Sequence, residues 1–224
     1  MNYDFDYADV LQQLPYLLGG ALVSLQIAFV AFFAGALLGL GGALGRVHGP
    51  RPLQRAIGAY VTFFTNTPAL VQVFFLYYAL PDAGVLLSPL TCVLIGFVLN
   101  SAAYLTEILR AGVVSVRRAE LEAAATLNMS RLQIVRHVIL PHVTRMIYAP
   151  LSNFFIILVL GSSMAALFGV EELTGRAINV STTNLRTIET FSVVAVIYIL
   201  ITFVASLSLA LLGRWAFRVH ARIF

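Results

Sequence analysis

The chain has 224 residues, of which 60% are hydrophobic and only 11% are charged. Soluble domains usually carry about 25% charged residues, so this composition excludes an ordinary soluble protein and indicates an integral membrane protein. The net charge is +4 and all the basic residues are Arg, which excludes a standard phosphate-binding P-loop because that loop requires a Lys.

The distribution of cysteine and histidine argues against a metal site. Cys92 is the single cysteine and lies in an apolar run, and the histidines are scattered at the ends of such runs. We therefore expect neither an intramolecular disulfide nor a bound metal. The first ten residues contain Asp but no basic residue, unlike the start of a cleaved signal peptide, so we expect the mature protein to keep them.

Five segments are apolar over about 20 residues, the length needed to cross a membrane. They cover about residues 17–44, 57–80, 86–109, 146–168 and 188–213. One alternating set of connections and ends holds twelve Arg, and the other holds two. Because basic connections stay in the cytoplasm, this asymmetry predicts an outside N-terminus and a cytoplasmic C-terminus. No soluble domain stands out, so we expect residues 1–224 to form one all-α transmembrane domain.

Small residues crowd the first span. The glycines in question are Gly35, Gly39, Gly41, Gly42 and Gly45. Such spacing allows helix backbones to approach closely in lipid, and we expect these residues to pack within the bundle.

The second span contains a polar stretch around a proline. Pro68 has no N–H, so the carbonyl of Phe64 loses its helical partner. Broken backbone at membrane depth is tolerated only where it is buried in protein or lines a wet cavity. We therefore hypothesise that Asn66, Thr67 and Gln72 line a translocation path. The alternative is a kink whose backbone groups are satisfied by neighbouring helices.

The segment of about residues 110–142, between the third and fourth spans, has too many charges to cross a bilayer. Residues 117–127 are strong helix formers with an Ala-rich face. Asn128 tolerates the left-handed conformation that ends a helix, and Ser130 with Gln133 forms a capping-box pattern for a second helix, which Pro141 limits. A small, flat Ala face suits the groove of a partner, although a solvated loop packed on its own bundle is the alternative.

Residues 120–142 resemble the EAA motif of ABC-transporter permeases, and we call them the EAA segment. The matching positions are Glu122, Ala123, Ala124, Asn128, Val138, Leu140 and Pro141. Asn128 and Val138 depart from the usual Gly and Ile, and both changes are physically tolerable. The resemblance implies two short coupling helices that dock on a separate cytoplasmic ATPase. That partner would bind ATP and Mg, so we expect no cofactor and no enzymatic activity in this chain.

The chain as a whole resembles the polar amino-acid (histidine/glutamine-type) permeases. The similar stretches include residues 61–81, 100–110 and 153–173. Two departures stand out: Thr65-Asn66 replaces the usual Arg-Gly, and Leu160-Gly161 replaces Lys-Asp before Ser162 and Ser163. We place Ser162 and Ser163 on the substrate path with the second-span residues. The resemblance implies a polar amino acid as solute, and the missing charges leave a related small polar solute as the alternative.

The same resemblance implies a location and a set of partners. The location is the plasma (inner) membrane of a prokaryote, in contact with lipid. The expected partners are the ATPase, a second permease subunit that is identical or similar, and an extracytoplasmic substrate-binding protein, with no role for nucleic acid.

Two other classes of function fit this sequence less well than an ATP-driven importer. A gradient-driven secondary transporter usually has ionisable groups near the midplane and internal repeats, and neither is evident in this sequence. A membrane enzyme would need a catalytic motif such as His-Glu-x-x-His or Gly-x-Ser-x-Gly, and the sequence contains neither.

Overall fold

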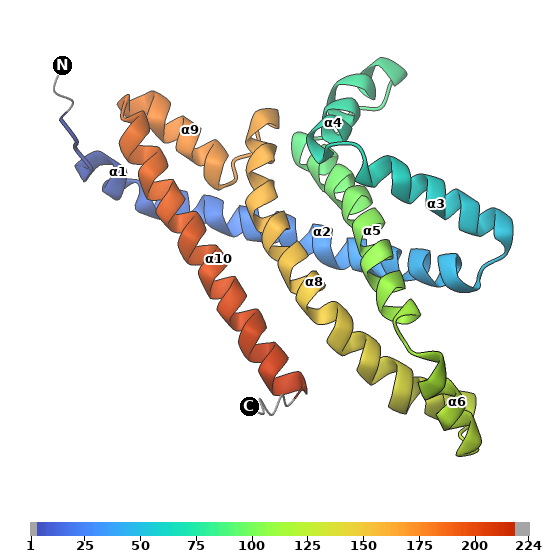
Figure 1. The fold of residues 1–224 in the computed structure, drawn as a ribbon. Coiled ribbons are helices and arrows are strands. Elements are labelled where there is room, and N and C mark those ends of the chain that lie inside the picture. Colours follow the sequence, from blue (N-terminus) through green and yellow to red (C-terminus); the bar gives the residue numbers. More distant parts are fainter. Residues whose placement is uncertain (1–3, 218–224) are drawn as a thin grey trace.

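The computed structural model describes residues 4–217, which form helices joined by short connections, with no strand in that range (Figure 1). Arg218 and Arg222, which contribute to the predicted orientation, lie outside the described residues. The α-helices are α1 (Ala8–Gln12), α2 (Leu14–His48), α3 (Arg51–Thr65), α4 (Ala69–Phe74), α5 (Pro89–Val114), α6 (Arg118–Thr126), α7 (Arg131–Ile134), α8 (Leu140–Gly161), α9 (Leu173–Asn184) and α10 (Thr187–Phe217). There are also two π-helical segments, η1 (Phe75–Ala79) and η3 (Val135–Ile139), and two 3₁₀ segments, η2 (Pro81–Ala83) and η4 (Ser162–Phe168).

Four helical runs are long and apolar enough to cross a membrane: α2, α5, Arg131–Phe168 and α10. A fifth crossing requires α3 and the run Ala69–Ala83 to act together as one broken span. The described residues therefore agree with an all-helical membrane protein of four or five crossings.

The predicted second span, residues 57–80, is not one straight helix. The run Arg51–Thr65 and the run Ala69–Ala83 are bent by 100° relative to each other. Pro68 accounts for the break, since it has no N–H to donate and its ring disfavours a helical conformation at Thr67. Residues 66–68 thus form a short loop between two helices.

The prediction that Pro141 ends a short helix is wrong. The helical run continues from Arg131 through η3 into α8, and Pro141 is the second residue of α8. The π-helical turn of η3 directly precedes the proline. Its wider i→i+5 hydrogen-bonding pattern opens the helix where proline cannot donate a hydrogen bond.

The glycines of α2 mark where α5 packs. A Cβ built at Gly35 would lie 2.6 Å from the Ser101 Cβ, and one at Gly42 would overlap the Thr106 side chain. Packing within the bundle is therefore confirmed for these two positions. A Cβ at Gly41 would meet nothing within 4 Å, so this glycine points away from the described helices and the prediction is wrong for it.

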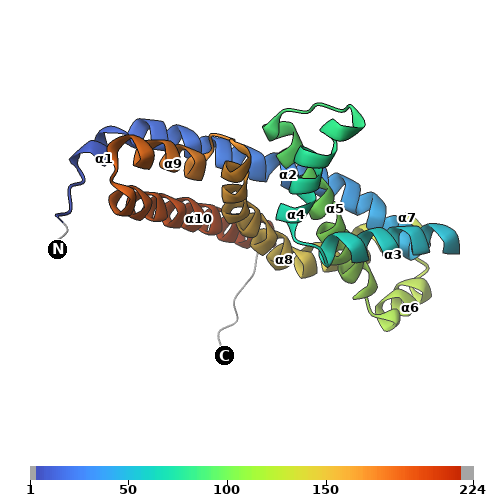
Figure 2. The ribbon, with the colours of Figure 1, turned by 90° about the horizontal axis from the view of Figure 1, so that it is seen from above.

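Residues 169–187, which connect the predicted fourth and fifth spans, contain the helix α9, which packs on α2 and α10 (Figures 1 and 2). Glu172 begins the helix: its fully buried carboxylate accepts hydrogen bonds from the N–H groups of Thr174 and Gly175 at 3.0 and 2.9 Å. The same carboxylate accepts from the hydroxyls of Ser24 at 2.9 Å and Tyr198 at 3.1 Å. One buried carboxylate thereby joins α2, α9 and α10.

Candidate functional site

The EAA segment begins with α6 and a tight turn at its C-terminal end. Asn128 has the left-handed conformation, with φ at 59°, as its sequence predicts. Its N–H donates to the carbonyl of Ala125 at 3.0 Å, and the N–H of Met129 donates to that of Ala124 at 3.2 Å. This pair of bonds is a Schellman motif, which satisfies carbonyls that the end of the helix would leave free.

The second helix of the EAA segment starts with the predicted capping box. The backbone N–H of Gln133 donates to the Ser130 hydroxyl, and the Gln133 side chain accepts from the N–H of Ser130. Because this helix continues into α8, the bend at residues 127–130 is held at the end of a membrane-crossing run. In Figure 1 α6 lies at the lower end of α8, with α9 and the α4–α5 connection at the upper end.

The motif residues differ in how much of each side chain a partner could contact. Ala124 is only 3% exposed, so it packs on its own chain, whereas Glu122 and Ala123 are exposed. Leu127 and Leu132 flank the turn and are 75% and 76% exposed. The sequence reasoning missed these two leucines, although their place on either side of Asn128, in a segment too polar to cross a bilayer, could have revealed them.

Of the remaining motif positions, Val138 is half-buried in η3, and Leu140 and Pro141 are exposed at the start of α8. These residues belong to the continuous run that leaves the turn. They therefore connect the turn to α8 and do not form a separate surface helix.

The break between α3 and α4 leaves backbone carbonyls that two neighbouring side chains satisfy. The Phe64 carbonyl accepts from the Asn100 amide at 3.0 Å and from the Gln72 amide at 3.1 Å. The Thr65 carbonyl accepts from the Tyr104 hydroxyl at 3.2 Å. This is the alternative that the sequence left open, a kink completed by its neighbours. Asn100 and Gln72 are nearly buried and hydrogen-bond to each other at 3.2 Å.

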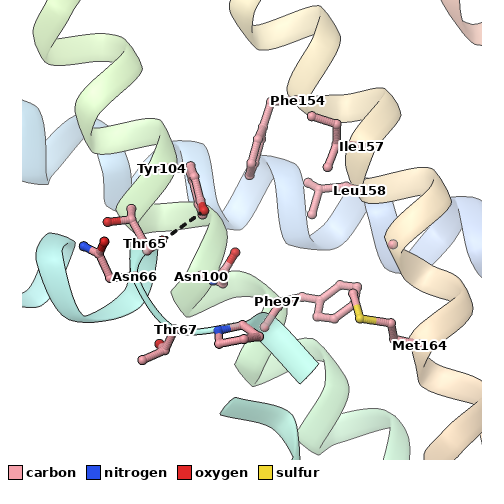
Figure 3. A pocket seen from close by; sticks show the side chains of 13 residues that line it. Thr65, Asn66, Thr67, Phe97, Asn100, Tyr104, Phe154, Ile157, Leu158 and Met164 are labelled. Carbon is pink, nitrogen blue, oxygen red and sulfur yellow. Dashed lines mark hydrogen bonds between the residues drawn. The ribbon is translucent and has the colours of Figure 1, made fainter. Parts of the chain in front are cut away.

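A cavity of about 540 Å³ lies beside the break, between the α3–α4 loop, α5 and α8 (Figure 3). Its lining residues are Thr65, Asn66, Thr67, Pro68, Ala69, Phe97, Asn100, Tyr104, Phe154, Ile157, Leu158, Gly161 and Met164. None of them carries a charge, so the described wall offers amide and hydroxyl groups, carbonyls and aromatic faces. Such a surface can hold a small polar solute without a counter-charge.

The predicted path residues divide between this cavity and other places. Asn66 and Thr67 line it, whereas Gln72 is found with Thr67 in a second, apolar cavity of about 330 Å³. Ser162 is buried and donates to the Val159 carbonyl at 2.7 Å, and Ser163 donates to the Leu160 carbonyl at 2.8 Å.

Toward η1 and η4, aromatic side chains lie in contact one to two helical turns beyond the cavity. The ring of Phe168 lies 5.1 Å from that of Phe74 and 5.5 Å from that of Tyr77, measured between centroids. The helix α4, which leads into η1, begins at Ala69, and η4 contains Met164; both of these residues line the cavity. Within residues 4–217 no group of three His, Cys, Asp or Glu side chains is placed to hold a metal ion.

Comparison with known proteins identifies relatives over nearly the whole chain. The sequence profile of the binding-protein-dependent transport system inner membrane component matches residues 31–218. The glutamine transport system permease protein GlnP of Escherichia coli K12 is 34% identical over 212 residues, covering 94% of this chain and 97% of its own. The L-cystine transport system permease protein TcyB of Bacillus subtilis 168 is 37% identical over 202 residues, covering 89% and 86%.

A solved structure is also similar to this chain over most of its length. It is the crystal structure of an amino acid ABC transporter with histidines, which aligns with a TM-score of 0.88 at 29% sequence identity. The alignment covers 95% of this chain and 99% of that one.

Proposed function

The chain belongs to the family of binding-protein-dependent transport system inner membrane components, and from this we propose that it is the transmembrane subunit of an ATP-driven ABC importer. Its solute is a polar amino acid or a similar small polar molecule, as the amino-acid permeases among its relatives suggest. It resides in the inner membrane of a prokaryote. The single observation that carries this proposal is the family match over residues 31–218.

We place the EAA segment in the cytoplasm, with the N-terminus outside. The twelve-to-two distribution of Arg between the two sets of connections supports this orientation. The end of the molecule that carries α9 then faces outward and is available to a substrate-binding protein. One subunit supplies one side of a pathway, so a second permease, identical or similar, completes it.

Coupling to a cytoplasmic ATPase is assigned to α6 and the turn that follows it. Leu127 and Leu132, on either side of the turn, and the small Ala123, one helical turn before Leu127, are exposed apolar residues on a segment too polar to cross a membrane. Helix-in-groove docking would bury these residues. The chain has no Lys for a P-loop of its own, which is consistent with ATP and Mg being bound by the partner.

The cavity beside the α3–α4 break is assigned to the translocation path. Asn66 and Thr67 contribute polar groups from the loop. Gln72 and Asn100 stabilise the break by donating hydrogen bonds to the Phe64 carbonyl. Gln72, Ser162 and Ser163 accordingly take supporting positions, with their polar groups hydrogen-bonded to protein.

Purification of the tagged protein from its native membranes in mild detergent tests the proposal. The wild type is compared with Leu127→Asp and with Leu86→Asp. The second is a matched control because Leu86 is 84% exposed and belongs to the α4–α5 connection, which lies at the opposite end of the molecule from α6 (Figure 1). We expect a P-loop ATPase to be retained by the wild type and the control and lost with Leu127→Asp. Ala124 is unsuitable for this test because it is buried.

If no ATPase is retained by the intact wild type, the proposal fails, and the next hypothesis to test is a carrier driven by an ion gradient. The same sample, analysed by mass spectrometry, identifies any second permease. Solute uptake that persists without ATP while the proton gradient is intact would directly contradict ATP-driven import.

A further inference from the structure

Three structural elements meet at His142, at the start of α8. The Nε2 atom of its ring lies 3.1 Å from the hydroxyl of Ser115, the residue that ends α5. Its Nδ1 atom lies 3.8 Å from a carboxylate oxygen of Glu120, in the first turn of α6. One imidazole thus faces both the end of α5 and α6.

The hydrogen-bond donors at this junction can be assigned from the geometry. The one hydroxyl proton of Ser115 is donated to the carbonyl of Gly112 at 2.7 Å, so toward the ring the Ser115 oxygen acts as an acceptor. The Nε2 atom of His142 must then carry a proton. The Nδ1 atom faces a carboxylate, which only accepts when ionised. The ring therefore links the two neighbours through its two nitrogens.

This junction is the polar tie between α6 and the membrane-crossing helices. The other ion pair of α6, between Arg118 and Glu122, lies within the helix, and so does the hydrogen bond from the Thr126 hydroxyl to the carbonyl of Ala123. Among residues 4–217 no other side-chain hydrogen bond or ion pair joins α6 to α5 or α8.

We propose that His142 is a positioning residue, which ties α6 to α5 and α8 through Ser115 and Glu120 so that movement of α6 reaches the cavity. This inference rests on the proposed function. From His142 the same helix runs twelve residues to Phe154 on the cavity wall, about 18 Å at the helical rise of about 1.5 Å per residue. From Ser115, α5 runs back eleven residues to Tyr104 on the facing wall.

The tie therefore acts on both helices that form the cavity walls. Movement of α6 would otherwise be transmitted through the chain at residues 115–117 and through the packing of α6 against η3. The hydrogen bond to Ser115 and the contact with Glu120 add a side-chain connection between α5, α6 and α8 that these two routes lack.

The test uses the complete complex of permease, ATPase and binding protein in proteoliposomes. A bimane fluorophore is attached at Ile157→Cys on the cavity wall, in a Cys92→Ala background, and the permease is labelled before the complex is assembled so that the label occupies one position. The change in its emission on adding ATP and Mg reports transmission to the cavity without any need to know the solute. His137→Ala is the matched control, since His137 is exposed and its one hydrogen bond, to the Gln133 carbonyl, is local.

His142→Ala should retain the ATPase on purification and reduce the ATP-dependent emission change by at least about fivefold, the low end of coupling between sites. His142→Arg, which can reach both Ser115 and Glu120 with several donors, should restore most of it. Glu120→Gln should reduce the change in the same way, and adding it to His142→Ala should cause no further loss, because the two residues act through each other.

The outcomes separate this inference from the proposed function. A wild-type complex that holds no ATPase contradicts the proposed function. A wild-type complex that responds to ATP while His142→Ala responds equally overturns the role of His142. If His142→Ala fails to assemble, Glu120→Gln decides: an unchanged response overturns the inference, and a reduced response at normal assembly supports it.

Discussion

Asn100 and Asn66 both lie at the cavity, yet replacing each by Leu should have different effects. Asn100→Leu should lower the stability of the protein, whereas Asn66→Leu should impair transport with little loss of stability. Asn100 is nearly buried and donates to the Phe64 carbonyl and to the Gln72 side-chain oxygen. Asn66 is exposed and donates to the Thr62 carbonyl, which already accepts from the Asn66 backbone N–H. The first residue therefore supports the break, and the second is free to face a solute.

The magnitudes follow from what each substitution leaves unpaired. Asn100→Leu removes the hydrogen bond to the Gln72 side-chain oxygen and one of two bonds to the Phe64 carbonyl, so we expect a loss of about 1–3 kcal/mol in the free energy of unfolding. Bonds between membrane helices average about 0.6 kcal/mol, which favours the lower half of that range. Asn66→Leu leaves the Thr62 carbonyl paired and should cost less than about 0.5 kcal/mol.

Unfolding in mixed detergent micelles, followed by far-UV circular dichroism, measures the stabilities because the described protein is helical throughout. Uptake in proteoliposomes measures the second effect, and Asn66→Leu should impair it while leaving the unfolding curve nearly unchanged. The reasoning is refuted if Asn100→Leu unfolds like the wild type, or if Asn66→Leu loses as much stability as Asn100→Leu.

Four further predictions concern other parts of the chain. Asn128→Gly should retain the ATPase in purification, whereas Asn128→Val should retain less of it. The left-handed conformation at position 128 costs a non-glycine residue about 1–2 kcal/mol, and a β-branched residue more, so Val would disrupt the turn. Gly35→Val should destabilise the α2–α5 packing by about 1–3 kcal/mol in the same unfolding assay, whereas Gly41→Val should be nearly neutral. Glu172→Leu should cost about 3 kcal/mol or more because four donors lose their acceptor, and protease cleavage within α9 should accelerate accordingly. Gly161→Asp should raise the uptake of cationic relative to neutral solutes, since it places a carboxylate on an uncharged wall; unchanged solute preference would count against the cavity as the path.

Local sequence signals were sufficient where the structure depends on adjacent residues. Asn128 in the left-handed conformation and the Ser130–Gln133 capping box follow from side chains that act within four positions. The break at Pro68 was also predictable, because a missing N–H acts on its own helix whatever surrounds it. The size of the bend was not, since it depends on Asn100 and Tyr104 of α5, which satisfy the freed carbonyls from a distant part of the chain.

The predictions that were wrong or missing concern features that depend on residues far away in the sequence. Pro141 has the features of a helix stop, and only the π-helical turn of η3 allows the helix to pass through it. The helix α9 could not be predicted because Glu172, which begins it, needs Ser24 and Tyr198 to be stable as a buried carboxylate. Exposed Leu127 and Leu132 resemble ordinary core residues in the sequence until the fold leaves them uncovered.

The structure locates the positions at which this chain departs from the polar amino-acid permeases. Thr65 stands where those permeases usually have Arg and Gly161 where they usually have Asp, and both positions line the 540 Å³ cavity. Leu160, in place of the usual Lys, is 48% exposed and is not among the lining residues. Two of the three missing charges would thus have opposite signs on one wall, where they could meet the two ends of an amino acid. In this chain carbonyls, amides and aromatic rings take their place. Under the proposed function this leaves two explanations to separate: a solute different from that of the charged permeases, or a second permease that carries the charges.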